Sequence, residues 1–198
     1  SPFLGGVPDG TASTQPLQLT LFTAIRRALD HNLGVLNAQE RGTLSAAAKK
    51  LQDNVGWKVM SDATSGARIG LPTKLVPQVI SDVNGTKWSS ATGTIQIEFL
   101  RRKEANATTA TVAANEKKSN ARKTDYSVVK PDFFVLSGMQ GLKKFYIRGQ
   151  TRNDEVRVLT ILYDQATEGT MTPVTVAMSS AYNPFPGGAV AQAGPPPR

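Results

Sequence analysis

The chain of 198 residues contains no cysteine and a single histidine, His31. Without cysteine it can form no disulfide, and it offers neither a thiolate nucleophile nor a sulfur ligand for zinc. His31 falls at the polar end of an expected N-terminal helix, beside Asp30 and Asn32, and not between a serine and a carboxylate. Histidine-based catalysis and histidine-based metal binding are both disfavoured, and we expect no metal and no cofactor.

Long apolar segments are absent too. No run approaches the roughly 18–20 residues that a membrane-spanning helix needs, so we expect no membrane span. The start, Ser1-Pro2-Phe3, has neither an initiator methionine nor a basic-then-apolar leader. We therefore expect a mature or trimmed chain.

Acidic residues are few, with 15 Asp and Glu against 23 Lys and Arg. A glycosidase needs two carboxylates held close together, whereas most of these acids fall in expected turns or at outward-facing positions: Asp82, Glu98, Asp154, Glu155, Asp164 and Glu168. The segment Gly138–Lys144 lacks the GxxxxGK[ST] spacing of a phosphate loop. A hydrolase with an inconspicuous site remains an alternative, with Asp164 and Glu168 as its candidates.

Positive charge is concentrated in residues 101–157, which hold 13 Lys and Arg and 6 Asp and Glu, a net +7 of the total +8. The alternation within residues 143–150 places Lys144, Tyr146 and Arg148 on one strand face, opposite Phe145 and Ile147. A basic face can attract polyanions, acidic lipids or an acidic protein, or it can be solvated or covered by a helix. The candidate binding residues are Lys143, Lys144, Tyr146 and Arg148, with Arg101, Arg102 and Lys103 as a second patch.

Apolar periodicity predicts an α+β fold, an antiparallel β-sheet flanked by helices. Helices are expected at about 20–33, 44–51 and 107–118, followed by a last helix, Pro173–Asn183, with Thr172 as its N-cap. Strands are expected at 57–60, 67–72, 76–83, 86–89, 94–99, 126–129, 133–137, 143–150 and 156–163. Turns are expected at Asn84-Gly85, at 138–141 and at 151–154. The sheet should be packed by the last helix and by one of the N-terminal helices.

Composition divides the chain into four parts. Residues 1–16 read as a flexible leader and 17–54 as an N-terminal helical segment. Residues 55–186 form the expected α+β sandwich domain, and 187–198 are a Gly- and Pro-rich linker or tail.

The first part of the chain resembles a known family. Its segments Pro2-Phe3-Leu4-Gly5-Gly6-Val7-Pro8, Leu17-Gln18-Leu19-Thr20 and Ala24-Ile25-Arg26-Arg27-Ala28-Leu29-Asp30-His31-Asn32-Leu33-Gly34 are similar to the mature start of TolC-like outer-membrane efflux proteins. The resemblance covers about residues 1–40. That family continues into very long helices and membrane strands, which the rest of this sequence does not predict. A fragment of an efflux system or a fused leader is therefore an alternative, and a complete channel is excluded.

A second resemblance covers residues of about 56–186. It is carried by the segments Gly56-Trp57, Gly70-Leu71-Pro72, Lys74-Leu75-Val76-Pro77, Lys130–Gly138, Lys143–Tyr146, Ala177–Ala181 and Pro184–Pro186. These segments resemble an uncharacterised proteobacterial module of exported proteins, found next to trypsin-like serine peptidase or caspase-like domains. The order of strands and last helix is also similar to the Mog1/PsbP-like α/β/α sandwich. No catalytic residue is implied.

Together these features predict a non-catalytic accessory or binding module, periplasmic or extracellular, within a larger envelope or secreted protein. Its partner should be a protein or an envelope component, and an acidic one would suit the basic face. Nucleic acid is disfavoured because a stacking platform uses several aromatic residues, whereas Tyr146 is the only one on that face. The sequence indicates no oligomeric state.

Overall fold

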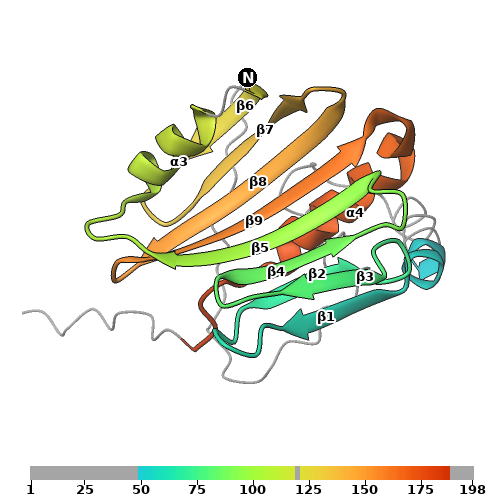
Figure 1. Ribbon diagram of the computed structural model, residues 1–198, viewed down its shortest axis with the longest axis horizontal. Coiled ribbons are helices and arrows are strands. Elements are labelled where there is room, and N and C mark those ends of the chain that lie inside the picture. The colour runs from blue at the N-terminus through green and yellow to red at the C-terminus, as the bar shows by residue number, and fades with distance from the viewer. Residues whose placement is uncertain (1–48, 119–120, 188–198) are drawn as a thin grey trace, which may run out of the picture.

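The computed structural model describes residues 49–118 and 121–187. The expected leader 1–16 and the expected helix 20–33 lie outside the described residues. The elements, labelled in Figure 1, are β1 (Trp57–Ser61), β2 (Arg68–Pro72), β3 (Gln78–Ser81), β4 (Gly85–Ser89), β5 (Ile95–Lys103), α3 (Thr109–Lys117), β6 (Arg122–Val129), β7 (Phe134–Gln140), β8 (Lys143–Arg152), β9 (Glu155–Asp164), the 3₁₀ turn η1 (Gln165–Thr167) and α4 (Glu168–Ala181). Residues 49–55 are helical.

Seven of the strands form one antiparallel sheet in the order β3-β4-β5-β9-β8-β7-β6, and β1 pairs with β2 in a separate two-stranded ribbon. The predicted α+β class, an antiparallel sheet flanked by helices, is confirmed. The strands β6, β7, β8 and β9 form a meander, because each pairs with its neighbour in sequence. The long strand β9 pairs with both β8 and β5, which joins the meander to the β3–β5 half of the sheet.

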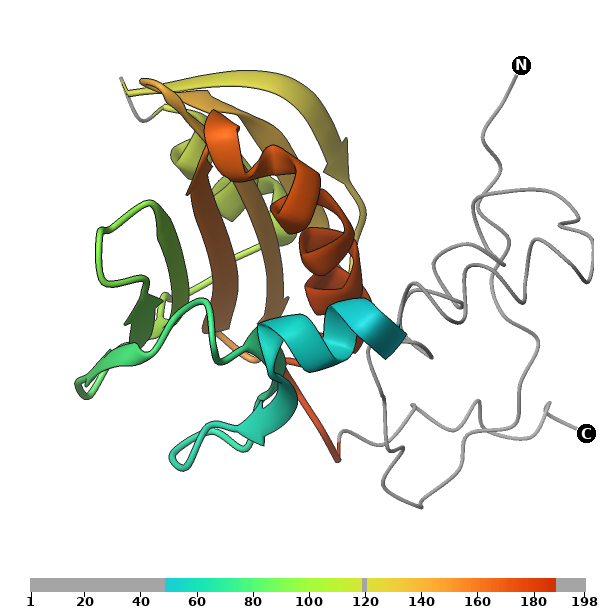
Figure 2. The same ribbon diagram turned by 90° about the vertical axis from the view of Figure 1, so that its right-hand side faces the viewer.

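The sheet is covered on both faces, so the molecule has three layers (Figure 2). On one face α4 and the β1–β2 ribbon pack against Leu159 and Ile161 of β9, while on the other α3 packs against Phe145 and Ile147 of β8. β9 contributes to both cores, with Leu159 and Ile161 in one and Val156 and Val158 in the other, because successive side chains of a strand point to opposite faces. The described end of the predicted N-terminal helical segment adds Val55, buried in the α4-side core, four residues beyond the expected helix end at Leu51.

The helix expected around 107–118 is confirmed as α3, although propensity suggested only a weak surface helix. Thr108 caps it, accepting a hydrogen bond from the backbone N–H of Thr111. Val112 and Ala113 are buried against the sheet. Tertiary packing, more than propensity, therefore stabilises this helix.

Two turns lie close to their predicted positions but not at them. The β3–β4 turn runs through Asp82, Val83 and Asn84, and Gly85 is already the first residue of β4. The Asp82 carboxylate accepts hydrogen bonds from the backbone N–H groups of Asn84 and Gly85, which shifts the turn toward Asp82. The β7–β8 turn is shorter than the predicted 138–141, because β7 continues through Gly138 to Gln140 and β8 begins at Lys143.

The expected start of the last helix is wrong. α4 begins at Glu168, directly after η1, so Pro173 lies inside the helix and Thr172 does not cap it. Pro173 removes one helical hydrogen bond. The helix nevertheless passes through it because Met171 and Val174, on either side, are both fully buried. Core packing here overrides the local signal.

Candidate functional site

A groove runs between α4 and the strands β6, β7 and β8, with a volume of about 900 Å³. This volume lies within the range of small-ligand and peptide sites. Its lining includes Asp125, Tyr126, Val135, Ser137, Met139, Lys144, Tyr146, Arg148, Glu168, Thr172, Thr175, Val176 and Ser179. Among the described elements, α4 packs mainly over β2 and β9, so none of the described helices covers this face of β6 and β7, where the groove lies.

The floor of the groove is the polar face of β8. Lys144, Tyr146 and Arg148 all line it, and Phe145 and Ile147 belong to the core on the opposite face. The predicted alternation of this strand is therefore confirmed. The cross-strand neighbours of the three polar residues are Met139, Ser137 and Val135 of β7, in that order.

Ser179 of α4 joins the helix to this floor. Its hydroxyl lies 2.6 Å from the Tyr146 hydroxyl, and Arg148 Nη1 donates to both Ser179 Oγ at 2.9 Å and the Ser179 carbonyl at 3.0 Å. Burial raises the pKa of Tyr146 above its usual value, against the opposing influence of Ser179 and Arg148. The phenol is thus neutral at physiological pH.

Arg148 carries a charge that no described carboxylate neutralises. Among residues 49–118 and 121–187, no Asp or Glu lies within ion-pair distance of it. Its guanidinium carbon lies 5.2 Å from the centre of the Phe133 ring, and its buried Nε has no hydrogen-bond partner in this part of the chain. In the groove wall, the Thr175 hydroxyl also has no hydrogen-bond partner among the described residues, although Thr175 is only 8% exposed.

The other end of the groove floor carries no excess of positive charge. Lys144 forms an ion pair with Glu168 in the first turn of α4, and the hydrogen bond between them raises the pKa of Lys144. Asp125, an exposed residue beside the irregularity between Thr124 and Tyr126 in β6, also lines the groove. The groove therefore has an uncompensated positive charge at the Arg148 end only.

Two large apolar side chains stand exposed in the same groove. Tyr126 of β6 is 56% exposed and Val176 of α4 is 40% exposed. Exposed apolar residues on opposite walls of one groove are typical of an interaction site.

The other predicted binding residues lie elsewhere. Lys143 points to the opposite face of the sheet, where it pairs with Asp164 and donates to the Gly93 carbonyl at 3.0 Å. It lines a second opening of about 890 Å³ there, with the exposed Leu142.

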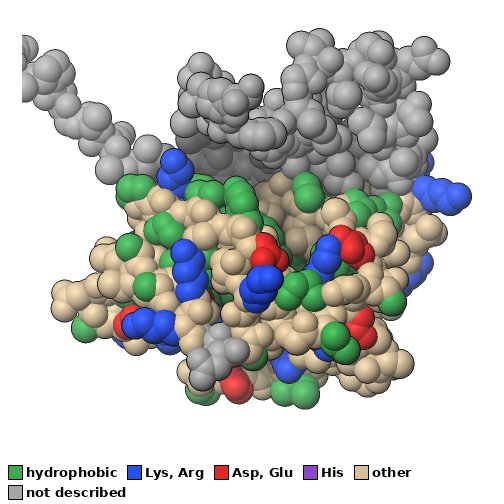
Figure 3. All heavy atoms as spheres, turned by 90° about the horizontal axis from the view of Figure 1, so that it is seen from above, with side chains coloured by type: hydrophobic (Ala, Val, Ile, Leu, Met, Phe, Trp, Pro, Cys, Tyr) green, Lys and Arg blue, Asp and Glu red, His purple; other side chains and the backbone are tan. Residues whose placement is uncertain are grey.

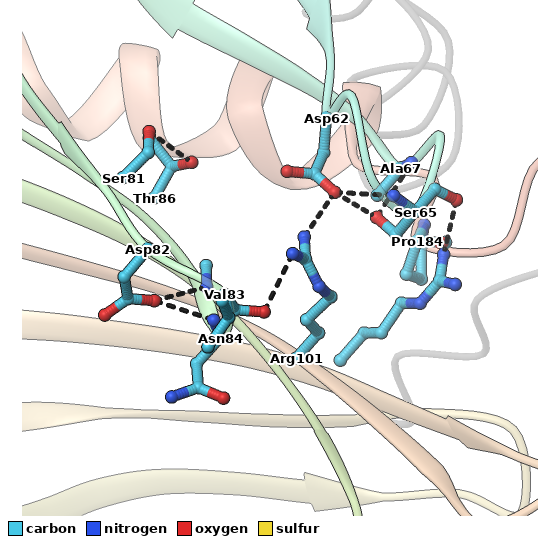
Figure 4. A network of polar contacts seen from close by, with 12 residues as sticks. Asp62, Ser65, Ala67, Ser81, Asp82, Val83, Asn84, Thr86, Arg101 and Pro184 are labelled. Carbon is cyan, nitrogen blue, oxygen red and sulfur yellow. Dashed lines mark hydrogen bonds and ion pairs between the residues drawn. The ribbon is translucent and has the colours of Figure 1, made fainter.

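Arg101, Arg102 and Lys103 do not form one patch, because neighbouring residues of β5 point to opposite faces. Arg102 pairs with Glu104, and Lys103 is exposed. Arg101 donates to Asp62 at 2.7 Å and to the Val83 carbonyl at 2.8 Å (Figure 4), which joins the β1–β2 ribbon to the β3–β4 turn. This network is structural. On the face that Figure 3 shows, basic and acidic side chains are interspersed, not gathered by sign.

The two candidate hydrolase residues are not brought together. Asp164 pairs with Lys143 on the α3 side of the sheet, and Glu168 pairs with Lys144 on the α4 side. Within the described parts of the chain, no group of three or more His, Cys, Asp or Glu is placed to hold a metal ion. The same residues contain no helix with the length and apolar character that a membrane crossing requires.

Sequence reasoning missed the residues that α4 and β6 contribute, namely Tyr126, Thr175, Val176 and Ser179. A signal for two of them was present. Thr175 and Ser179 are four residues apart and adjoin the apolar stripe that includes Ala177 and Met178, so they form a polar seam on one helix face.

No family model and no curated protein matches this chain. Among solved structures, it is similar to CyanoP, the PsbP protein of the cyanobacterium Synechocystis sp. PCC 6803, whose solution structure is known. The identity is 10%, the match covers 65% of this chain and 92% of CyanoP, and the TM-score is 0.47.

Proposed function

We propose that this chain is a non-catalytic binding module, and that the groove between α4 and β6–β8 holds an extended segment of a partner protein. The observation that carries the proposal is the groove itself. It joins a floor that includes the half-buried Arg148 to apolar walls that include Tyr126 and Val176. Such a combination suits a peptide, which presents both charged and apolar side chains.

The polar residues of the groove are poorly suited to turnover. The Ser179 hydroxyl forms hydrogen bonds with two side chains of the groove floor. A nucleophilic serine, however, needs a base beside it. Its partners are Tyr146, which burial keeps protonated, and the cationic Arg148. Neither can accept the serine proton at neutral pH, which supports binding over hydrolysis.

We place this module in an exported protein, periplasmic or extracellular, where it would serve a neighbouring domain such as a peptidase. The support is the resemblance of residues 56–186 to the exported proteobacterial module. The coding sequence on either side of this chain tests this context, and a flanking region without a peptidase or a secretion leader would count against it. The efflux-fragment alternative concerns residues 1–40, which lie outside the described residues.

The binding function can be tested with a phage library of random twelve-residue peptides, panned on the immobilised full chain. Enriched peptides would be synthesised and their affinities measured by fluorescence anisotropy for the wild type, for Val176→Asp in the groove, and for Leu142→Asp on the opposite face. Both positions are exposed, so neither change should unfold the protein.

We expect Val176→Asp to weaken binding at least about tenfold, because it places a charge in the apolar wall. Leu142→Asp should leave binding unchanged. Equal binding to all three proteins would refute the groove as the site, and failure to enrich any peptide would refute the function. Mass spectrometry of the peptides after long incubation should show no cleavage.

A further inference from the structure

We infer that the segment bound in the groove carries an acidic side chain that pairs with Arg148, and an apolar side chain about two positions away that is held between Tyr126 and Val176. This inference rests on the proposed function and names the chemistry of its ligand. It comes from the uneven distribution of charge along the floor of the groove.

The first step is that most of the other buried or half-buried arginines among the described residues pair with a carboxylate, and the exception is Arg68. Arg101 pairs with Asp62, Arg122 with Glu116 and Arg157 with Glu155. Arg148 has only the neutral oxygens of Ser179 and the ring of Phe133 as described partners. A half-buried charge without a counterion is unfavourable, and a charge-assisted hydrogen bond from a ligand carboxylate would remove that cost.

The second step is that the guanidinium is already oriented. Two hydrogen bonds from Nη1 to Ser179 and the contact with the Phe133 ring hold it against α4. A fixed guanidinium loses little conformational entropy when it binds, and its planar donors fit a carboxylate. This favours a carboxylate over a diffuse attraction to any polyanion.

The third step is that the charges along the groove determine which end takes the acidic side chain. Lys144 is neutralised by Glu168, and Asp125 adds a negative charge to the lining. A second carboxylate near Lys144 would therefore meet acidic groups. Lys144 and Arg148 are four residues apart in an extended strand, so the two ends of the floor are about 13 Å apart. The acidic side chain should bind at the Arg148 end, with about four residues of extended segment reaching the other.

The apolar part of the segment has its place in the middle of this span. Tyr126 is paired across the sheet with Ser137, and Ser137 with Tyr146. This row therefore lies two residues from Arg148 along β8. An apolar side chain there would cover the exposed Tyr126 ring and Val176. The expected motif is an acidic residue and an apolar residue about two positions apart.

The test uses the peptides enriched on the full-length wild-type chain. Each would be compared with its Glu→Gln or Asp→Asn form in binding to the wild type, Arg148→Met, Arg148→Lys and the control Arg152→Met. Arg152 is exposed and contacts the Phe185 ring outside the groove. Circular dichroism and melting curves would check that each variant is folded.

We expect the enriched peptides to share an acidic residue, and neutralising it to weaken binding to the wild type about tenfold or more. Arg148→Met should bind both peptide forms equally, Arg148→Lys should keep part of the preference, and Arg152→Met should behave like the wild type. The preference should diminish as salt is raised. If Arg148→Met proves unfolded, comparing the acidic and neutralised peptides on the wild type still shows whether binding needs the carboxylate.

Two outcomes separate the inference from the proposed function. Peptides that lose binding with Val176→Asp but are insensitive to neutralisation of their acids would overturn the carboxylate inference and leave the groove as the binding site. Peptides that are insensitive to Val176→Asp, or the absence of any enriched peptide, would overturn both.

Discussion

Gly149 offers the sharpest test of the core packing beneath the floor of the groove. It lies in β8 directly opposite Phe134 of β7, on the face covered by α3. A Cβ atom at this position would lie 2.3 Å from Phe134 Cε1 and 2.4 Å from Cζ. Gly149→Ala therefore requires the fully buried Phe134 ring to move, because carbon atoms in contact are normally about 3.5–4.0 Å apart.

The size of the effect follows from two opposing terms. Overpacking a well-filled core costs about 1–3 kcal/mol. Since Gly149 does not have a positive φ, alanine can adopt its backbone conformation, and the reduced entropy of the unfolded chain offsets about 0.4–1 kcal/mol. We expect the free energy of unfolding to fall by about 1–2 kcal/mol, which for a chain of this length lowers Tm by roughly 2–8 °C.

Urea denaturation and thermal melting would measure this change, with Gly169→Ala as the matched control. Gly169 lies in α4, and apart from its chain neighbours and the backbone of its own helix no atom of the described residues lies within 4 Å of its Cβ position. Alanine there should therefore stabilise the protein slightly. Combining Gly149→Ala with Phe134→Leu, which removes the clashing ring atoms, should cost less than the sum of the two single changes. A Gly149→Ala protein at least as stable as the wild type would refute the reasoning.

Two further predictions concern ionisation. Burial favours the protonated form of Asp62, but hydrogen bonds from Ser65 and the charge of Arg101 outweigh it and hold the pKa of Asp62 below 3.8. Its contribution to stability is thus present above the ordinary carboxyl pKa and is lost as pH falls through the lowered value. Asp62→Asn should reduce the free energy of unfolding at pH 7 by about 1–3 kcal/mol, as measured by urea titration. It should also make the fall of this free energy between about pH 4 and pH 2 less steep. An unchanged dependence of the free energy of unfolding on pH in this range would contradict the prediction. Burial also raises the pKa of Tyr146 and of Tyr182, whose buried hydroxyl has no described partner, so both phenols should ionise later than an ordinary tyrosine as pH rises. In an ultraviolet titration of tyrosine ionisation, Tyr146→Phe and Tyr182→Phe should each remove part of the absorbance change that occurs at the highest pH. Loss of absorbance change at the pH of an ordinary tyrosine would instead show that the side chain is not buried.

Local patterns predicted most of the strands because burial on a pleated surface leaves a period of two in the sequence. The alternation of Phe145 and Ile147 with the polar residues of β8 is confirmed on both faces. The same patterns failed where side chains or packing shift a boundary. The Asp82 carboxylate shifts the β3–β4 turn to residues 82–84, so that Gly85 begins β4. The buried Met171 and Val174 carry α4 through Pro173.

The candidate site was only half predictable. Lys144, Tyr146 and Arg148 are in one strand, so their common face follows from local geometry. Arg101 and Lys143 are equally basic in sequence, yet both are engaged in ion pairs with residues from other strands or loops. Which cation keeps an uncompensated charge depends on partners far away in the chain, and a single sequence does not specify those distances.

The sequence by itself determined the α+β class, the polar row on β8 and the shortage of groups for acid–base or metal chemistry. Only the tertiary structure decided that α4 lies to one side of β6 and β7, that a groove opens beside it, and that Ser179 reaches Arg148 across 31 positions of the chain. The physical reason is that periodicity within an element depends on its own backbone geometry, whereas a groove depends on how elements pack against each other. That packing is the joint result of many contacts distant in sequence.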